Sequence, residues 1–216
     1  MIEMEQDIRL ENAIIAATLT SVSKRTGRRF VPIAISNRHV HLCKSDFDKL
    51  FGVKAELVAY KPLVQPGQFA AEQKVSLVGP NGRIDGIRVL GPLRDMTQIE
   101  VSVTDTYKIG IRPEVCMSGS PEGSPGARLE TDSGSVDVSS GVMVAARHLH
   151  MTEAQAKTYG LVNGQIVSLK KSGARETIFG NFVVRSGAGH SLEAHIDTDE
   201  ANAALIDSGE LLEVSS

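Results

Sequence analysis

Residues 75–90 read VSLVGPNGRIDGIRVL, and this stretch carries two apolar runs, 75–78 and 84–90, on either side of Pro80-Asn81-Gly82. Asn-Gly between two such runs is a strong signal for a β-hairpin. The composition agrees, because 20 Gly, 8 Pro, three Tyr and no Trp indicate many turns between short elements. We therefore expect a strand-rich fold, in a chain of 216 residues that could form one domain or two small ones.

Outside this hairpin, short apolar runs alternate with turn signals along most of the chain. Further strands are expected at residues 30–36, 98–103, 136–138, 141–146, 166–169 and 178–184. The helices between them are expected to be brief. Residues 118–126 are rich in Gly and Ser and predict a loop, and loops of this kind often contact ligands.

Residues 1–29 differ from the rest of the chain. Met4, Ile8, Ile15, Leu19 and Val22 fall near one face of a helix, and residues 23–29 predict a polar linker. Such a helix either packs on its own domain or docks on a partner, and the sequence alone leaves both alternatives open.

Charge and composition exclude several classes of partner. The net charge of -3 and the pI of about 6.1 provide no basic field for nucleic acid or an anionic membrane. Two cysteines, Cys43 and Cys116, are too few for a disulfide scaffold. No apolar stretch approaches the roughly 20 residues that cross a bilayer. We expect a cytoplasmic protein that binds neither nucleic acid nor membrane.

A partial internal repeat connects two distant parts of the chain: Arg38-His39-Val40-His41-Leu42 matches Arg147-His148-Leu149-His150-Met151. Each is expected to end a strand and to lead into a short helix. A third stretch, Ala194-His195-Ile196-Asp197-Thr198-Asp199-Glu200, also sets a histidine before a capped helix, which is expected to end near Gly209. The pattern predicts two related half-sites.

Capping residues mark the helices that follow the two matching stretches. Ser45 is the expected N-cap of the first helix, and Gly52 lies beyond its end. Thr152 and Gln155 form the expected capping box of the second helix, which Gly160 terminates.

The histidines of these stretches point to a metal site. Side chains alternate along a strand, so His39 projects with His41, and His148 with His150. One His-x-His pair alone is weak evidence, because buried, hydrogen-bonded histidines explain most such pairs. Two in equivalent contexts, together with His195, exceed the needs of one tetrahedral zinc and suit two ions with open positions. Iron, nickel and cobalt compete with zinc for such ligands, and Cys43 is expected at the helix entry rather than as a ligand.

Five motifs in order resemble the PduL-type phosphate propanoyltransferase family. They are residues 35–42 (ISNRHVHL), 65–69 (QPGQF), 89–94 (VLGPLR), 145–150 (AARHLH) and 195–202 (HIDTDEAN). The resemblance runs from about Val31 to the C-terminus and implies a mainly β fold of two closely packed β-barrels with short capping helices. The first strand of the core would complete the C-terminal barrel. One barrel would comprise residues 30–37 and 146–216, the other residues 38–145, after an N-terminal helix and linker at 1–29.

The resemblance also implies which residues hold the metal. Two zinc ions are expected: one held by His39, His41 and Glu100, the other by His148, His150 and His195. The matching phosphate-binding arginine is Arg94, which we expect to be catalytic, since a guanidinium offers forked donors to phosphate. The coenzyme A path would include Ser36, Lys61, Arg88, Leu90 and Asn202, and Ser118 would add donors to phosphate.

The activity implied is a reversible phosphate acyltransferase, which converts propionyl-CoA or acetyl-CoA and inorganic phosphate to acyl phosphate and coenzyme A. Family members of bacterial microcompartments carry an amphipathic N-terminal helix that directs encapsulation, so residues 1–22 are expected to bind shell proteins, and the lumen of a microcompartment is the implied location. Acyl chain length, direction and oligomeric state, including a homo-oligomer, stay open.

Two other functions remain compatible with the residues. A dinuclear zinc hydrolase would use hydroxide in place of phosphate and cleave a thioester or phosphoester. A non-enzymatic metal-binding barrel module would bind a small ligand without turnover.

Overall fold

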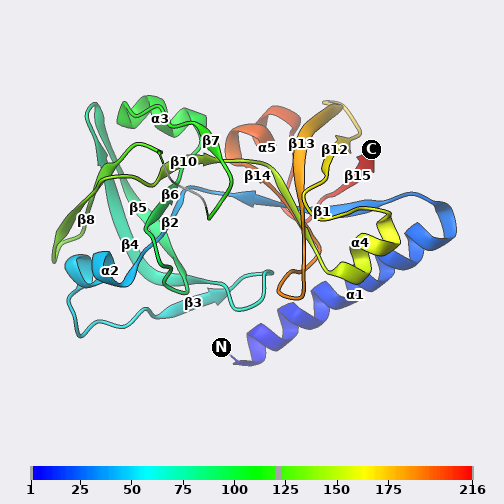
Figure 1. Cartoon of the computed structure of the whole chain (residues 1–216), viewed down its shortest axis with the longest axis horizontal. Helices are drawn as coiled ribbons and strands as arrows, with labels where there is room; N and C mark the ends of the chain where they lie inside the picture. The colour runs from blue at the N-terminus through cyan, green and yellow to red at the C-terminus, as the bar shows by residue number, and fades with distance from the viewer. Residues whose placement is uncertain (1, 120–122, 216) are drawn as a thin grey trace. The chain divides into compact units, whose positions relative to one another are not determined.

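The computed structural model describes residues 2–119 and 123–215, with side chains described from Gln6 onward. Met4 of the predicted apolar helix face therefore lies outside the described side chains. Residues 120–122 of the predicted loop lie outside the described residues as well. The fold is mainly β, as expected, and the chain divides into two compact units (Figure 1). The first unit comprises Met1–Ser36, Val64–Pro66 and Ala146–Ser216, and the second comprises Asn37–Leu63 and Gly67–Ala145.

The first unit is a closed six-stranded barrel. Its strands, in order around the barrel, are β1 (Phe30–Ser36), β14 (Glu193–Asp197), β11 (His148–Met151), β13 (Thr177–Ser186), β12 (Ile166–Lys171) and β15 (Leu211–Ser215). Strand β1 pairs in parallel with β14 and antiparallel with β15. The first strand of the chain therefore completes the C-terminal barrel, as the family resemblance implied.

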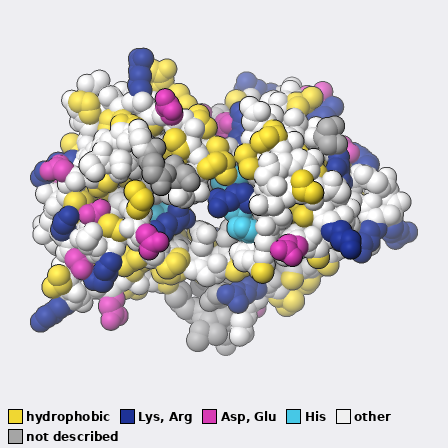
Figure 2. Space-filling model, in the orientation of Figure 1, with side chains coloured by type: hydrophobic (Ala, Val, Ile, Leu, Met, Phe, Trp, Pro, Cys, Tyr) yellow, Lys and Arg dark blue, Asp and Glu magenta, His cyan; other side chains and the backbone are white. Residues whose placement is uncertain are grey.

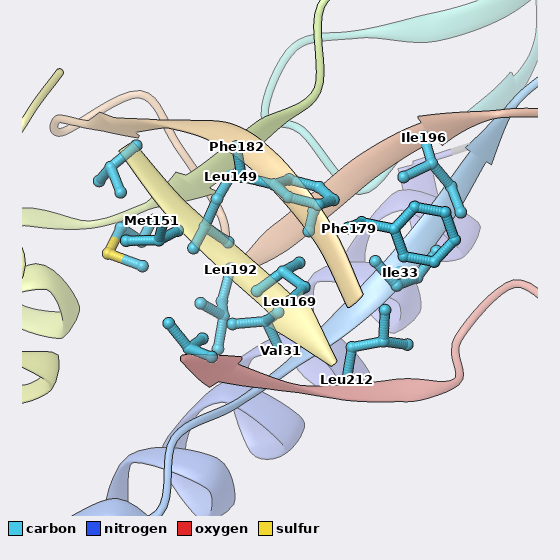
Figure 3. Close-up of a cluster of buried hydrophobic side chains, with 14 of the residues drawn as sticks. Val31, Ile33, Leu149, Met151, Leu169, Phe179, Phe182, Leu192, Ile196 and Leu212 are labelled. Atoms are coloured by element: carbon cyan, nitrogen blue, oxygen red, sulfur yellow. The ribbon is translucent and has the colours of Figure 1, made fainter. Parts of the chain in front are cut away.

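Apolar side chains from all six strands fill this barrel (Figure 3). Val31 and Ile33 alternate with more exposed neighbours along β1 and are 0% and 1% exposed. Phe182 of β13 is fully buried in the same cluster. Complete burial of one such side chain contributes about 1.5–3 kcal/mol, and truncating Phe182 to Ala would cost about 3–5 kcal/mol.

The second unit contains a curled nine-stranded sheet that forms a half-barrel. Its path runs β7 (Val115–Cys116), β10 (Val142–Ala145), β6 (Gln98–Glu100), β2 (His39–His41), β5 (Gly82–Gly91), β4 (Phe69–Gly79), β8 (Ala127–Glu130) and β9 (Ser135–Val138), and β3 (Ala59–Pro62) pairs with β4. Strands β4 and β5 form the hairpin predicted around Asn81-Gly82. Leu77, Ile87 and Val89 of this hairpin lie in the buried core of the sheet.

Among the described residues, four helices are brief, as predicted: α2 (Lys44–Phe51), α3 (Val103–Ile109), α4 (Glu153–Tyr159) and α5 (Thr198–Ala204). Helix α4 has the expected capping box of Thr152 and Gln155 and the C-cap Gly160. Gly52 lies just beyond the end of helix α2, as expected, but the N-cap is Cys43, so the assignment of Ser45 was wrong. Cys43 lies at the helix entry, as expected.

Two other element boundaries differ from the prediction. The strand expected at residues 98–103 ends at Glu100, because Ser102 and Asp105 form a capping box that starts α3 at Val103. Helix α5 ends at the C-cap Leu205, in the left-handed region, well before Gly209.

The N-terminal helix α1 (Ile2–Thr26) is longer than predicted and includes most of the expected linker. Leu19 and Ser23 are each 6% exposed, and Leu19 belongs to the core of the first unit. Leu10 and Ile14 are 61% and 58% exposed. The C-terminal half of the helix is thus packed on its own unit, whereas the preceding turns present apolar side chains to solvent.

Two observations concern surface charge and the apolar character of the helices. Lys and Arg side chains are interspersed with Asp and Glu on the face shown in Figure 2. Among the described residues, no helix has the length and apolar character that a membrane crossing requires.

Candidate functional site

The first group of candidate ligands lies on two neighbouring strands of the second unit. Strand β2 runs antiparallel to β6, and the register places His39 opposite Glu100 and His41 opposite Gln98. Because alternate residues share a face, these four side chains project together. His39, His41 and Glu100 are buried and offer ligand atoms that all lie within 4.8 Å of one another.

Backbone carbonyls orient both imidazoles of this group. His39 Nδ1 donates to the Asn37 carbonyl oxygen at 2.8 Å, and His41 Nδ1 donates to the Leu90 carbonyl oxygen at 3.2 Å. His39 Nε2 then faces Glu100 Oε2 at 3.5 Å. Carbonyl contacts of this kind fix the tautomer of a metal-binding histidine and leave the other nitrogen for the ion.

Burial and neighbouring charges shift the pKa values of all three ligands of the first group. Burial, together with the charges of His39 and Arg94, lowers the pKa of His41 to about 3. Burial raises the pKa of the Glu100 carboxyl, but the charges of His39 and His41 and the hydrogen bonds from His39 and Ser118 together lower it by more, so the net shift is downward. Glu100 raises the pKa of His39 in return, against the opposing effect of burial. A carboxylate and two imidazoles form a donor set that suits zinc.

Arg94 lies beside the first group in a network of polar side chains. Its Nη1 donates to Gln98 Oε1 at 3.3 Å and to Ser118 Oγ at 3.5 Å. Ser118 Oγ donates to Glu100 Oε1 at 2.9 Å, and Gln98 Nε2 donates to the same oxygen at 2.7 Å. The structure thus brings together Arg94, Ser118 and Glu100, which the sequence analysis assigned to one site.

Three predicted coenzyme A residues also lie in the second unit. Leu90 supplies the carbonyl that holds His41. Arg88 is opposite His39 in the β2–β5 register, its Nη1 donates to the Ala71 carbonyl at 2.8 Å, and its guanidinium lies 5.0 Å from the centre of the Tyr60 ring. Lys61 is exposed on β3.

The second group lies in the first unit and repeats this plan. Strand β11 runs antiparallel to β14, with His148 opposite His195 and His150 opposite Glu193. His148, His150 and His195 offer ligand atoms within 4.8 Å of one another. His148 Nδ1 donates to the Ala146 carbonyl at 2.8 Å, as His39 does to Asn37.

His150 provides a test of whether this group fits a metal ion. Its Nδ1 is buried without a hydrogen-bond partner, and no other described side-chain nitrogen or oxygen shares that condition. Burial, with the charges of His148, His195, His190 and Arg185, lowers the pKa of His150 to about 2. An unsatisfied buried nitrogen is costly, whereas a neutral imidazole in this setting is ready to bind a cation. The donor set of three imidazoles fits zinc.

The remaining predicted residues lie in the first unit as well. Ser36, the last residue of β1, places its Oγ 3.4 Å from His195 Nδ1. Asn202 is exposed on α5. His190, which the sequence analysis left aside, packs against His150 with ring centres 4.5 Å apart and ring planes tilted by 33°.

Sequence reasoning missed Gln98 and Glu193, which contact the third ligand of their respective groups. A signal was present: Gln98 to Asp105 and Glu193 to Glu200 both contain a polar residue, a ligand two positions later and a capping box after it. The arginines of the two Arg-His-x-His stretches bind these capping boxes, since Arg38 pairs with Asp105 and Arg147 with Glu200. The internal repeat therefore has four stretches, and not three.

The chain is similar to known proteins over most of its length. The family model for phosphate propanoyltransferase matches residues 32–207. A phosphate propanoyltransferase of Citrobacter freundii is 46% identical over 194 residues, which cover 89% of this chain and 92% of that protein. The enzymes of the same name from Shewanella putrefaciens and Thermotoga maritima are 42% and 45% identical and cover 93% and 83% of this chain, and 95% and 86% of their own lengths. The chain therefore belongs to the phosphate propanoyltransferase family.

Proposed function

We propose that this protein is a zinc-dependent phosphate acyltransferase that converts acyl-CoA and inorganic phosphate to acyl phosphate and coenzyme A, reversibly. One zinc ion would be bound by His39, His41 and Glu100, and the other by His148, His150 and His195. The observation that carries the proposal is that two ligand groups, each with one position to spare, occur in a chain of this family.

The reaction balances without a covalent enzyme intermediate. An oxygen of phosphate attacks the thioester carbonyl, the new carbon–oxygen bond forms, and the carbon–sulfur bond breaks. Coenzyme A leaves as a thiolate and takes up a proton. When bound, zinc would stabilise that thiolate and neutralise charge on phosphate.

Arg94 is the residue that we assign to phosphate. Its guanidinium is held beside Gln98 and Ser118, so its planar donors are oriented before the substrate arrives. Ser118 would donate to the same anion. Holding phosphate and thioester in line could recover about 7–11 kcal/mol of the barrier.

The remaining assignments concern coenzyme A. We assign Lys61 and Arg88 to its phosphates, and Ser36, Leu90 and Asn202 to the path of its pantetheine arm. Ser36 supports this assignment, because its hydroxyl lies beside His195. For the exposed apolar turn of α1 around Leu10 and Ile14, we propose docking on a microcompartment shell protein.

The deciding experiment measures coenzyme A release from acetyl-, propionyl- and butyryl-CoA with phosphate present or omitted, together with elemental analysis. We expect release that requires phosphate, an acyl phosphate trapped by hydroxylamine, and two zinc ions per chain. Release without phosphate would establish a hydrolase, and tight binding with no turnover would establish a binding module. Full activity in a metal-free chain would exclude zinc.

A further inference from the structure

The second ligand group is accompanied by a buried carboxylate that the family resemblance does not assign to any role. Glu193 is 9% exposed, and its Oε2 lies 3.0 Å from His195 Nε2. Glu193 also lies opposite His150 in the β11–β14 register. Three imidazoles and one carboxylate thus share a face of two neighbouring strands.

Gln65 holds this carboxylate from the other side. Its Nε2 donates to Glu193 Oε2 at 3.1 Å and to the Ser191 carbonyl at 3.2 Å, and its Oε1 accepts from the Ser191 amide at 3.1 Å. Gln65 is 5% exposed and belongs to the Val64–Pro66 segment, which is part of the first unit although its sequence neighbours are not. This accounts for Gln65 of the QPGQF motif, to which the proposed function gives no role.

The geometry indicates which nitrogen of His195 is left for an ion. A carboxylate can only accept, so His195 Nε2 carries the hydrogen and Nδ1 carries the lone pair. The ligand atoms within 4.8 Å of one another come from His148, His150 and His195, and Glu193 does not belong to this group. Ser36 Oγ lies 3.4 Å from Nδ1, on the side that remains.

The first group contains a similar pair of residues, in which the hydrogen-bond donor and acceptor are exchanged. There the third ligand is the acceptor Glu100, and the residue two positions earlier is the donor Gln98, whose Nε2 lies 2.7 Å from Glu100 Oε1. In the second group the third ligand is a donor, and the residue two positions earlier is the acceptor Glu193. Each ligand is therefore matched with a support of opposite hydrogen-bonding character.

We propose that Glu193 is a positioning residue of the second metal centre: held by Gln65, it accepts the Nε2 hydrogen of His195 and presents Nδ1 to the ion. This inference rests on the proposed function, since it requires zinc at the second group. Carboxylates that support a metal-binding histidine contribute about 10–100-fold to metal affinity.

The test is a competition titration of zinc with a chromophoric chelator on the full chain. The two equivalents are assigned with H39A/H41A and H148A/H150A. E193L removes the acceptor and should weaken the second equivalent about 10–100-fold, with the first unchanged. E193Q keeps an acceptor oxygen and should lose much less. Q98L is the matched control and should weaken the first equivalent only.

A second measurement reads the tautomer of His195 directly, by long-range ¹H–¹⁵N correlation in the metal-free chain. We expect the hydrogen on Nε2 in the wild type, and a loss of this preference in E193L. Wild-type affinity for both equivalents in E193L, equal weakening of both, or a hydrogen on Nδ1 in the wild type would each overturn the inference. A wild type that binds a single equivalent would refute the two-ion proposal, while the tautomer of the metal-free chain still tests the Glu193 contact.

Discussion

The two ligand groups share one plan and differ in their third ligand. In both, a His-x-His strand faces a strand that leads into a capped helix, and the first histidine binds a backbone carbonyl two residues earlier. In the first group the carboxylate, Glu100, is itself a ligand, whereas the second group offers three imidazoles and has the carboxylate of Glu193 beside His195. Negative charge near a divalent ion would therefore come from a ligand in the first group and from the neighbour of a ligand in the second.

The largest effect is expected from removing one histidine pair at a time. H148A/H150A and H39A/H41A should each lose one of two zinc ions, because each removes two of three ligands. Each should lower kcat/KM by about 1,000-fold, since a metal supplies several kcal/mol of transition-state stabilisation. Elemental analysis and phosphate-dependent coenzyme A release measure both. A variant that keeps both ions and its activity would show that its group is not a metal centre.

The next effect concerns Arg94, which lies beside the first group and donates a hydrogen bond to Ser118. R94A should raise the KM for phosphate and lower kcat/KM by about 10–100-fold, because a charge-assisted hydrogen bond contributes about 1.5–3 kcal/mol. Zinc content should stay at the wild-type value. R128A, at the exposed position of strand β8, is the control and should behave as the wild type. An unchanged phosphate KM in R94A would remove Arg94 from the phosphate site.

Acid should destabilise both groups of the metal-free protein. The pKa of His41 is lowered to about 3 and that of His150 to about 2, so both stay neutral in the folded state while the unfolded chain takes up protons below 6.5. Stability from these residues is complete above pH 6.5 and is lost as the pH falls, and the raised pKa of His39 offsets part of the loss.

Urea denaturation in chelator measures this effect. Between pH 7 and 5.5, the wild type should lose about 1 kcal/mol more than H150Q, in which the titrating group is gone. H41Q should show a difference of similar size. A parallel pH dependence of the wild type and both variants would contradict the lowered pKa values.

The smallest effect on activity concerns α1, which belongs to one unit only. Removing residues 1–12 should leave Tm and kcat/KM unchanged, because the buried residues Leu19 and Ser23 remain. Removing residues 1–28 deletes both and should cost about 2–5 kcal/mol. Differential scanning calorimetry measures the shift, and L19A separates the packing effect from the loss of the helix. A stable 1–28 deletion would show that the docked half of α1 contributes nothing.

Much of the fold followed from patterns within a few residues of each other. The hairpin at Asn81-Gly82 and the capping box at Thr152 were predictable, because turn geometry and helix capping depend on local chemistry. Ser45 was wrong as an N-cap because the N-cap is Cys43, two residues earlier, whose side chain makes no capping hydrogen bond. Gln98 and Glu193 were overlooked because the partner of a polar strand residue can be predicted only when the opposite strand is known.

The sequence by itself determined that His39 shares a face with His41, and His148 with His150, since strand side chains alternate whatever the strand pairs with. Only the tertiary structure decided that β6 lies against β2 and β14 against β11, which brings Glu100, Gln98, His195 and Glu193 to those histidines. It also placed Gln65 on Glu193, 128 positions apart in the chain. Pairing over such separations depends on the register and closure of whole sheets, and no local pattern encodes it.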